Sequence, residues 1–244
     1  MEERPSPLRR LGRALKRGFR RVTGPSNRKV RRLYAEEEYL DAYSAHTDIR
    51  VHRDPHAAVG GHWFTHGKLQ LDFLVGQGLR PGHRLLEIGG GTLRAGRHFA
   101  SYLEPGGYTG VDISPAALQY AHALVEREGL ADRKPRLLLN ETKRLTFDFV
   151  RGERFDFLIA YSVFTHLKPA HVEECFRHVG SVLAPGAAFF FTYNESPTYV
   201  EDSVKDFRFP RSFFEKAAAK HDLSVEPRPF EDPTGQRMLR LARA

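Results

Sequence analysis

Cysteine is almost absent from this chain of 244 residues, which contains only Cys175. One cysteine excludes an internal disulfide and any zinc site built from several cysteines. The sequence also lacks a run of about 18 consecutive apolar residues, the length typical of a membrane-spanning helix. Together with 41% hydrophobic and 28% charged residues, these absences predict one main globular domain in the cytoplasm, with Cys175 buried in its core.

A glycine-rich turn lies between an expected strand and an expected helix. Residues 84 to 96 read Arg-Leu-Leu-Glu-Ile-Gly-Gly-Gly-Thr-Leu-Arg-Ala-Gly. Glycines let the backbone approach a ligand, and free N–H groups at the start of the next helix are expected to face an anion. A dinucleotide fingerprint anchored on Gly89 and Gly91 needs a third glycine where Arg94 stands, which disfavours NAD. A phosphate loop needs a lysine where Arg97 stands, which disfavours ATP.

The remaining pattern is an acid followed by glycines. Glu87, Gly89 and Gly91 are followed by Asp112 at the end of the next expected strand. This pattern resembles the first two motifs of class I S-adenosylmethionine-dependent methyltransferases, whose usual additional glycine is replaced by Leu93. The resemblance extends over most of the chain. It implies S-adenosyl-L-methionine as cofactor and a Rossmann-like methyltransferase fold of the α/β class, with a seven-stranded, mainly parallel sheet, an antiparallel C-terminal strand and helices on both faces.

The resemblance also implies roles for individual residues. In this family the glycine turn passes under the methionine part of the cofactor, and an acid after the second strand accepts both ribose hydroxyls, the role expected of Asp112. A cation suits the methionine carboxylate, so Arg94, or else Lys68, is expected to pair with it, the alternative for Arg94 being a solvated or structural salt-bridge role. Ile113 is expected to pack on the adenine. The expected cofactor-binding residues are Glu87, Gly89, Gly90, Gly91, Arg94, Asp112, Ile113, Asn140, Glu141, Tyr161 and Ser162.

Strand and helix patterns alternate regularly after the turn, which predicts an open parallel sheet with right-handed crossovers. Because ligands of such sheets bind at the carboxyl ends of the strands, four loops are expected to form one site there. We expect strands over residues 84–89, 107–112, 136–140, 155–161 and 187–193, helices over 93–103, 115–128, 170–183 and 210–221, and a terminal hairpin over 223–227 and 236–242.

Methyl transfer is a single displacement, so alignment of the reactants provides most of the acceleration. A hydroxyl acceptor also benefits from a base, and the imidazole of His166 is the candidate, the alternative being support of the following helix. The signature of base-amino methyltransferases is absent, because residues 161 to 164 read Tyr-Ser-Val-Phe. We therefore expect a small molecule, sugar or natural product to be methylated on oxygen, or less readily on nitrogen. The loop over residues 194–209 is expected to shape the acceptor pocket.

Positive charge is concentrated at the N-terminus. Residues 1–33 contain 12 Lys and Arg and two acids, whereas the other 211 residues contain 26 basic and 28 acidic groups. Apolar residues from Leu8 to Val22 recur at helical spacing among arginines, which predicts a basic amphipathic helix. Residues 1–50 are expected to form a tail and arm, and residues 51–244 the cofactor-binding domain.

The basic helix suits a solvated extension, an anionic membrane surface or nucleic acid. Two alternative functions follow: an RNA methyltransferase that uses the tail as an anchor, or a binding protein with a methyltransferase-like fold and no catalysis. His62 and His66 are spaced as a metal-binding pair, but the glutamate of HExxH is missing and no third ligand is indicated, so no metal is expected. The oligomeric state is left open.

Overall fold

The computed structural model describes residues 25–244. The amphipathic helix predicted over residues 8–22 lies outside the described residues. The chain divides into two compact units, the first ending at His46 and the second extending over Thr47–Ala244. The first unit contains α2 (Pro25–Glu36) and the beginning of α3 (Tyr39–Arg53), and within it the Tyr34 hydroxyl lies 3.3 Å from Nδ1 of His46. No helix among the described residues is long and apolar enough to cross a membrane.

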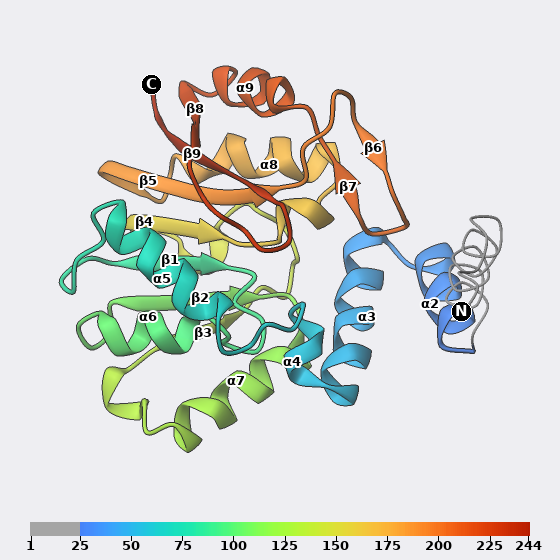
Figure 1. The fold of residues 1–244 in the computed structure, drawn as a ribbon, viewed down its shortest axis with the longest axis horizontal. Helices are drawn as coiled ribbons and strands as arrows, with labels where there is room; N and C mark the ends of the chain where they lie inside the picture. Colours follow the sequence, from blue (N-terminus) through green and yellow to red (C-terminus); the bar gives the residue numbers. More distant parts are fainter. Residues whose placement is uncertain (1–24) are drawn as a thin grey trace, which may run out of the picture. The chain divides into compact units, whose positions relative to one another are not determined.

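The second unit alternates strands and helices as the sequence predicts (Figure 1). Its larger elements are α4 (Pro55–Ala58), α5 (His66–Gly76), β1 (Leu85–Ile88), α6 (Gly96–Tyr102), β2 (Tyr108–Asp112), α7 (Pro115–Arg127), β3 (Arg136–Leu139), β4 (Phe155–Ala160), α8 (Pro169–Val179), β5 (Leu183–Tyr193), α9 (Arg211–Ala219), β8 (Leu223–Arg228) and β9 (Arg237–Arg243). Ser114 caps α7 as its residue type suggests, because its side chain accepts a hydrogen bond from the N–H of Ala117.

The strands form a seven-stranded sheet in the order β3-β2-β1-β4-β5-β9-β8. Neighbouring strands from β3 to β5 are parallel, and β9 runs antiparallel to both β5 and β8. The predicted Rossmann-like fold with an antiparallel C-terminal strand is therefore confirmed.

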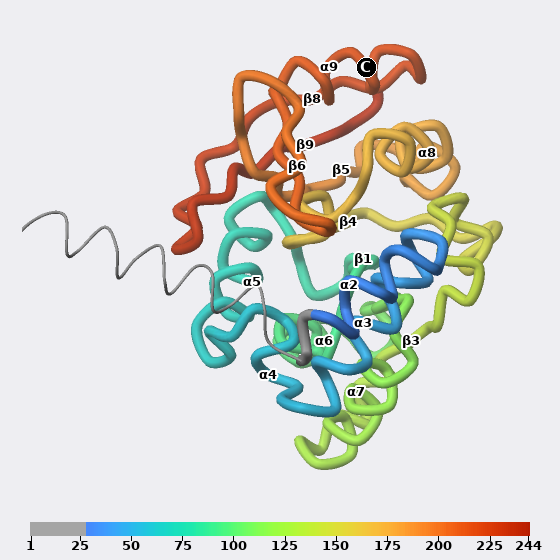
Figure 2. Tube along the Cα trace, turned by 90° about the vertical axis from the view of Figure 1, so that its right-hand side faces the viewer, coloured from blue at the N-terminus to red at the C-terminus, as the bar shows by residue number. Residues whose placement is uncertain are grey.

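Alternate residues of the central strands face two different helical layers. Phe157 and Phe190 belong to a core cluster that also contains Leu74 of α5, Phe99 of α6 and Leu124 of α7. On the opposite face, the Phe191 ring packs against Phe164, Phe176 of α8 and Phe214 of α9. Figure 2 shows α5 and α8 on opposite sides of the strands. Both faces of the sheet are thus covered, as the near-continuous apolar sequence of β4 requires.

The largest differences from the predicted boundaries occur at two places in the chain. The helix expected from residue 93 begins at Gly96, because Leu93 adopts a left-handed backbone with φ +72°. The helix expected to end at residue 183 ends at Val179, and Leu183 instead begins β5 and pairs with Phe155. Buried Val182 and Leu183 continue the apolar pattern past the helix, which explains the wrong boundary.

The predicted acceptor loop contains a small hairpin of its own. Strands β6 (Val200–Glu201) and β7 (Phe207–Arg208) pair antiparallel within residues 194–209. Phe207 and Phe209 are fully buried, so this segment is anchored in the core at one side. Cys175 is also buried, as predicted.

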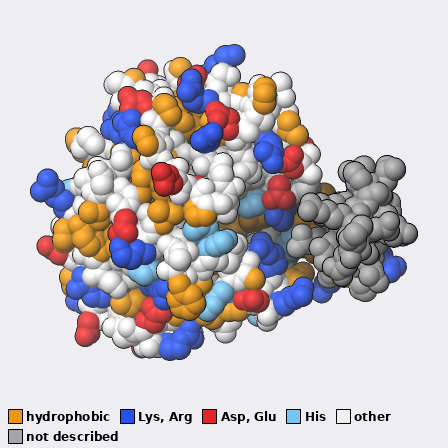
Figure 3. All heavy atoms as spheres, viewed as in Figure 1, with side chains coloured by type: hydrophobic (Ala, Val, Ile, Leu, Met, Phe, Trp, Pro, Cys, Tyr) orange, Lys and Arg blue, Asp and Glu red, His pale blue; other side chains and the backbone are white. Residues whose placement is uncertain are grey.

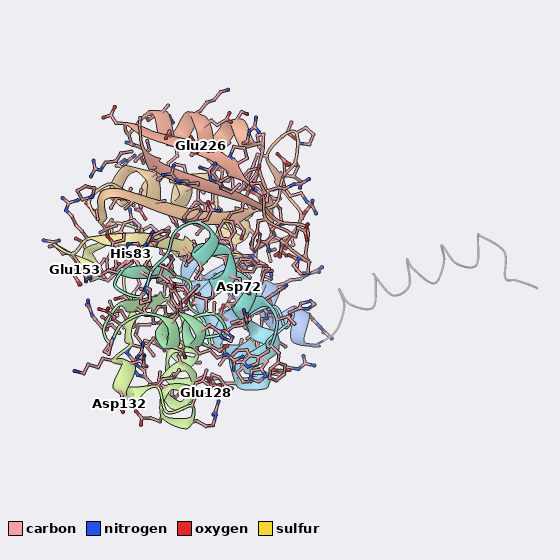
Figure 4. All side chains as sticks on the ribbon, turned by 60° about the vertical axis from the view of Figure 1, so that its left-hand side comes forward. Asp72, His83, Glu128, Asp132, Glu153 and Glu226 are labelled. Carbon is pink, nitrogen blue, oxygen red and sulfur yellow. The ribbon has the colours of Figure 1, made fainter. Side chains whose placement is uncertain are left out.

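Charges of both signs are mixed over the described surface in Figure 3. Several acids labelled in Figure 4 belong to surface ion pairs. Glu153 pairs with both Arg84 and Arg136, and Glu128 pairs with Arg97. Partly exposed pairs of this kind stabilise a fold by about 1 kcal/mol or less each.

Candidate active site

The site begins at the glycine turn that follows β1. Gly89 and Gly91 both have left-handed backbones, with φ +73° and +57°. A Cβ atom on Gly89 would lie 2.5 Å from Cγ2 of Val163, and one on Gly91 would lie 2.7 Å from Cγ1 of Val59. Both positions therefore require glycine, because Val163 and Val59 pack directly against the turn, and the backbone of Gly89–Gly91 forms a tight cradle.

The N–H groups of this turn are not directed at a ligand, contrary to what a glycine-rich helix start suggests. Those of Gly89 and Gly90 donate to the carbonyl of Val111, and that of Gly91 donates to Oδ2 of Asp112. These bonds hold the turn against the end of β2. A ligand can therefore approach the backbone of the turn closely. It does not find free N–H donors at these three glycines.

Asp112 connects the turn to the loop after β2. Its Oδ2 accepts from Gly91 N and its Oδ1 accepts from Ser114 N, both at 2.8 Å. Burial raises the pKa of Asp112, although the N–H groups of Ser114, Gly91 and Ile113 oppose that shift. Each carboxylate oxygen has two lone-pair sites, so capacity remains for hydroxyl donors of a ligand.

Leu93 occupies the position where the family pattern usually has glycine. It is 1% exposed and belongs to the core cluster that contains Leu74 of α5 and Phe99 of α6. A left-handed leucine is strained by about 1–2 kcal/mol, and burial of a leucine side chain stabilises by a similar or larger amount. Packing thus offsets the backbone strain at this turn.

Glu87 is buried beneath the turn and accepts a hydrogen bond of 2.6 Å from the Tyr108 hydroxyl. Burial raises the pKa of Glu87 to about 7, although Tyr108 and the charge of Arg94 oppose the shift. The carboxyl is therefore partly protonated near neutral pH. Either form accepts from Tyr108, so Glu87 orders the packing below Gly90.

We expect Glu87→Gln to change how stability depends on pH. A carboxyl whose pKa is raised on folding stabilises fully below its unfolded value of about 4.5 and loses that contribution as pH rises through about 7. Relative to the glutamine variant, the wild type should lose up to about 3 kcal/mol of unfolding free energy between pH 5 and pH 8.

Urea unfolding at both pH values measures this difference. Exposed Glu141→Gln is the matched control. Its unfolding free energy should depend on pH in the same way as that of the wild type. A constant free-energy difference between wild type and Glu87→Gln across this range would contradict the assignment.

Arg94 is buried and bound to the backbone that precedes α5. Its Nη1 donates to the carbonyls of Val59 at 2.6 Å and Gly61 at 2.9 Å. Its guanidinium lies 5.4 Å from the centre of the Tyr161 ring. Lys68, the alternative partner for a ligand carboxylate, is exposed and pairs with Asp72 at 2.6 Å.

The other predicted cofactor residues lie at the ends of β3 and β4. Asn140 uses its side chain within its own loop, donating to Arg144 O and accepting from Thr142. Glu141 is exposed. Tyr161 is buried and donates to Asp232, and Ser162 has a left-handed backbone at φ +57°.

Most of these residues lie at the same end of the sheet, just beyond the carboxyl ends of its parallel strands. Strand β1 lies between β2 and β4, and all three are parallel, so Gly89, Asp112 and Tyr161 follow adjacent carboxyl ends. Asn140 follows β3, the next strand outward. The predicted four loops therefore do meet at one end of the sheet.

His166 ends the short helical turn η3 (Phe164–His166) after β4. Its Nδ1 lies 2.7 Å from the carbonyl of Lys205 and 3.3 Å from Oδ1 of Asp206. Burial would raise the pKa of Asp206, but bonds from His166, Lys205 and Ser203 outweigh it and lower the pKa. Asp206 is thus an ionised partner of the imidazole.

Sequence reasoning did not find several residues that shape this site. Asp206 and Asp232 lie in loops without hydrophobic periodicity, so only the tertiary structure reveals their partners. Asp48 Oδ1 accepts from the hydroxyl of Ser114 and from Ala116 N at the start of α7. A signal did exist for Asp206, because its loop was expected to border the acceptor.

The histidines between residues 56 and 66 pack against neighbouring rings. His56 Nε2 lies 3.1 Å from the Tyr120 hydroxyl, and its ring stacks on Trp63 at 3.9 Å. The rings of His62 and His66 lie 4.5 Å apart. Within residues 25–244, no three His, Cys, Asp or Glu side chains are grouped so that they could hold a metal ion.

Comparison with known proteins finds one family match and several proteins of the same fold. Residues 86–189 match the family model described as a methyltransferase domain. The fold is similar to that of magnesium protoporphyrin IX methyltransferase from Synechocystis PCC 6803 with bound SAH, at 16% identity over 94% of this chain and 100% of that one, with a TM-score of 0.59.

Two further solved structures share the fold. The glycopeptide N-methyltransferase MtfA, complexed with S-adenosyl-L-methionine, is 13% identical over 73% of this chain and 94% of that one, with a TM-score of 0.59. The mitomycin 7-O-methyltransferase MmcR is 17% identical over 91% of this chain and 70% of that one, also with a TM-score of 0.59. These similarities show a methyltransferase-domain match over residues 86–189 and a fold shared with S-adenosylmethionine-dependent methyltransferases.

Proposed function

We propose that this enzyme transfers a methyl group from S-adenosyl-L-methionine to an oxygen of a small molecule, sugar or natural product. The observation that carries the choice of oxygen is the contact between Nδ1 of His166 and the Lys205 carbonyl at 2.7 Å. A carbonyl only accepts hydrogen bonds, so Nδ1 carries the proton and Nε2 of the neutral ring carries the lone pair. Such a ring can take a proton from an acceptor hydroxyl.

The residues at the glycine turn suit the cofactor. The turn at Gly89 and Gly91 carries no side chain of its own, so a ligand can approach its backbone, and we assign this turn the methionine end of the cofactor. Asp112 is assigned the ribose hydroxyls, and Ile113 with Asn140 or Glu141 the adenine. Bound S-adenosyl-L-methionine supplies an electrophilic methyl group on its sulfonium sulfur. The enzyme's own part is to align the acceptor with that methyl group and to exclude water.

The structural neighbours support an acceptor of moderate size. Two of them are named for natural products, one as a 7-O-methyltransferase and one as a glycopeptide N-methyltransferase. We propose the same broad class of acceptor here. Screening metabolites, sugars, natural products and bulk RNA with labelled cofactor tests this proposal, and RNA as the only methylated class would contradict it.

His166→Gln should separate catalysis from cofactor binding. Glutamine keeps a polar side chain but provides no base, so we expect kcat to fall by about 100-fold or more on a hydroxyl acceptor. Affinity for S-adenosylhomocysteine should stay within about twofold, which calorimetry checks. Unchanged kcat in the variant would limit His166 to supporting η3.

A further inference from the structure

Arg94 is a buried cation that feels the charges of Glu87 and Asp232 but makes no direct ion pair with either of them. Its residue is 7% exposed, and no carboxylate of residues 25–244 forms an ion pair with it. Its hydrogen bonds within this part of the chain all involve Nη1, so Nε and Nη2 keep donor hydrogens. A buried charge is costly unless it is paired, which points to an anionic ligand.

His66 presents a second buried group with an unmet hydrogen-bonding capacity. It begins α5, is 2% exposed, and its Nε2 has no partner among the described residues. Leaving such a group unpaired costs about 1–3 kcal/mol. Gln70, one helical turn later, bonds through its amide only to the carbonyl of His66 and does not satisfy that nitrogen.

The contact with Arg94 fixes which nitrogen of His66 carries the proton. Nδ1 lies 3.5 Å from Nη1 of Arg94. An arginine only donates, so a proton on Nδ1 would face a cationic donor, and the lone pair belongs there instead. Burial, the charge of Arg94 and His62 lower the pKa of His66, so the ring is neutral near pH 7. Nε2 is therefore a buried N–H donor.

Both donors lie beside the candidate active site. The His66 ring is 5.8 Å from the Tyr161 ring, and Arg94 lies over the same ring. Tyr161 follows β4, and Val163, two residues later, reaches the cradle of Gly89. One cation and one neutral donor next to this turn match the two oxygens of a carboxylate.

We propose that His66 is a ligand-binding residue whose Nε2–H donates a hydrogen bond to a carboxylate held by Arg94, and that this is the carboxylate at the methionine end of the cofactor. The inference rests on the proposed function, because that function supplies the cofactor. A carboxylate on the methyl acceptor would have the same chemistry, and the experiment distinguishes the two sources.

Calorimetric titration of the full-length chain with two probes tests this inference. S-adenosylhomocysteine contains the carboxylate, whereas 5′-methylthioadenosine lacks the amino-acid part. His66→Phe keeps a ring but removes the donor, so we expect S-adenosylhomocysteine affinity to fall at least about tenfold. Affinity for 5′-methylthioadenosine should stay within about twofold. His66→Gln restores a donor near the position of Nε2 and should recover most of the loss.

Exposed His122→Gln is the control and should leave both affinities unchanged. Unchanged S-adenosylhomocysteine affinity in His66→Phe overturns the inference and leaves the proposed function standing, the result expected if the acceptor carries the carboxylate. Equal losses for both probes also overturn it, because they indicate a structural role. Wild-type protein that binds neither probe refutes the proposed function itself.

Discussion

Gly89→Ala is expected to lower the affinity for S-adenosylhomocysteine by about 100-fold or more. The left-handed backbone at φ +73° strains any residue with a Cβ atom by about 1–2 kcal/mol. The new atom would also lie 2.5 Å from Cγ2 of Val163, so the loop after β4 must shift. Because that loop and the turn both border the proposed cofactor site, affinity should fall more than stability. Calorimetry and urea unfolding on the same preparation measure the two effects.

Gly129→Ala is the matched control. Gly129 has a similar left-handed backbone at φ +66°, but nothing lies within 4 Å of its added Cβ atom, and it follows α7, outside the four loops. We expect a loss of about 1 kcal/mol in unfolding free energy with unchanged affinity. If Gly89→Ala and Gly129→Ala had the same affinity for S-adenosylhomocysteine, the role of the glycine turn in cofactor binding would be contradicted.

Asp112→Asn is expected to reduce S-adenosylhomocysteine affinity to a similar degree. Both carboxylate oxygens accept backbone N–H groups at 2.8 Å, from Gly91 and from Ser114. In either orientation, the amide of asparagine directs its NH₂ group at one of these donors, which costs about 1–3 kcal/mol. The variant also loses a carboxylate oxygen that could accept from the proposed ribose hydroxyls.

Titration with S-adenosylhomocysteine measures this loss. Asp72→Asn serves as the control, since Asp72 is an exposed acid paired with Lys68 within α5 and should affect binding and stability little. An Asp112→Asn variant that binds as tightly as wild type would remove Asp112 from the cofactor site.

Local sequence patterns were enough to predict the sheet and the end of the sheet at which the candidate residues meet. Apolar β4 and the regular alternation of elements predict a parallel sheet, and the glycines with Asp112 predict which strand ends form the site. The contacts between loops were not predictable. The left-handed Leu93, the Asp206 partner of His166 and the bonds from Arg94 to Val59 and Gly61 depend on segments that are distant in sequence or on local strain offset by packing.

The roles of individual loop residues were correspondingly harder to predict. The sequence indicated free N–H groups at the glycine turn, whereas Val111 and Asp112 accept them. His66 appeared as half of an incomplete metal pair, and its unmet donor became visible only once α5 was placed beside Arg94. Periodicity reports which residues are buried, but it does not report which polar atoms lack a partner.

Calorimetric titration of the full-length wild-type chain with S-adenosylhomocysteine tests the central claim most directly. The site formed by the glycine turn and Asp112 predicts one binding site per chain with a dissociation constant on the order of micromolar, and competition by S-adenosyl-L-methionine. Absence of binding at millimolar ligand would contradict the claim.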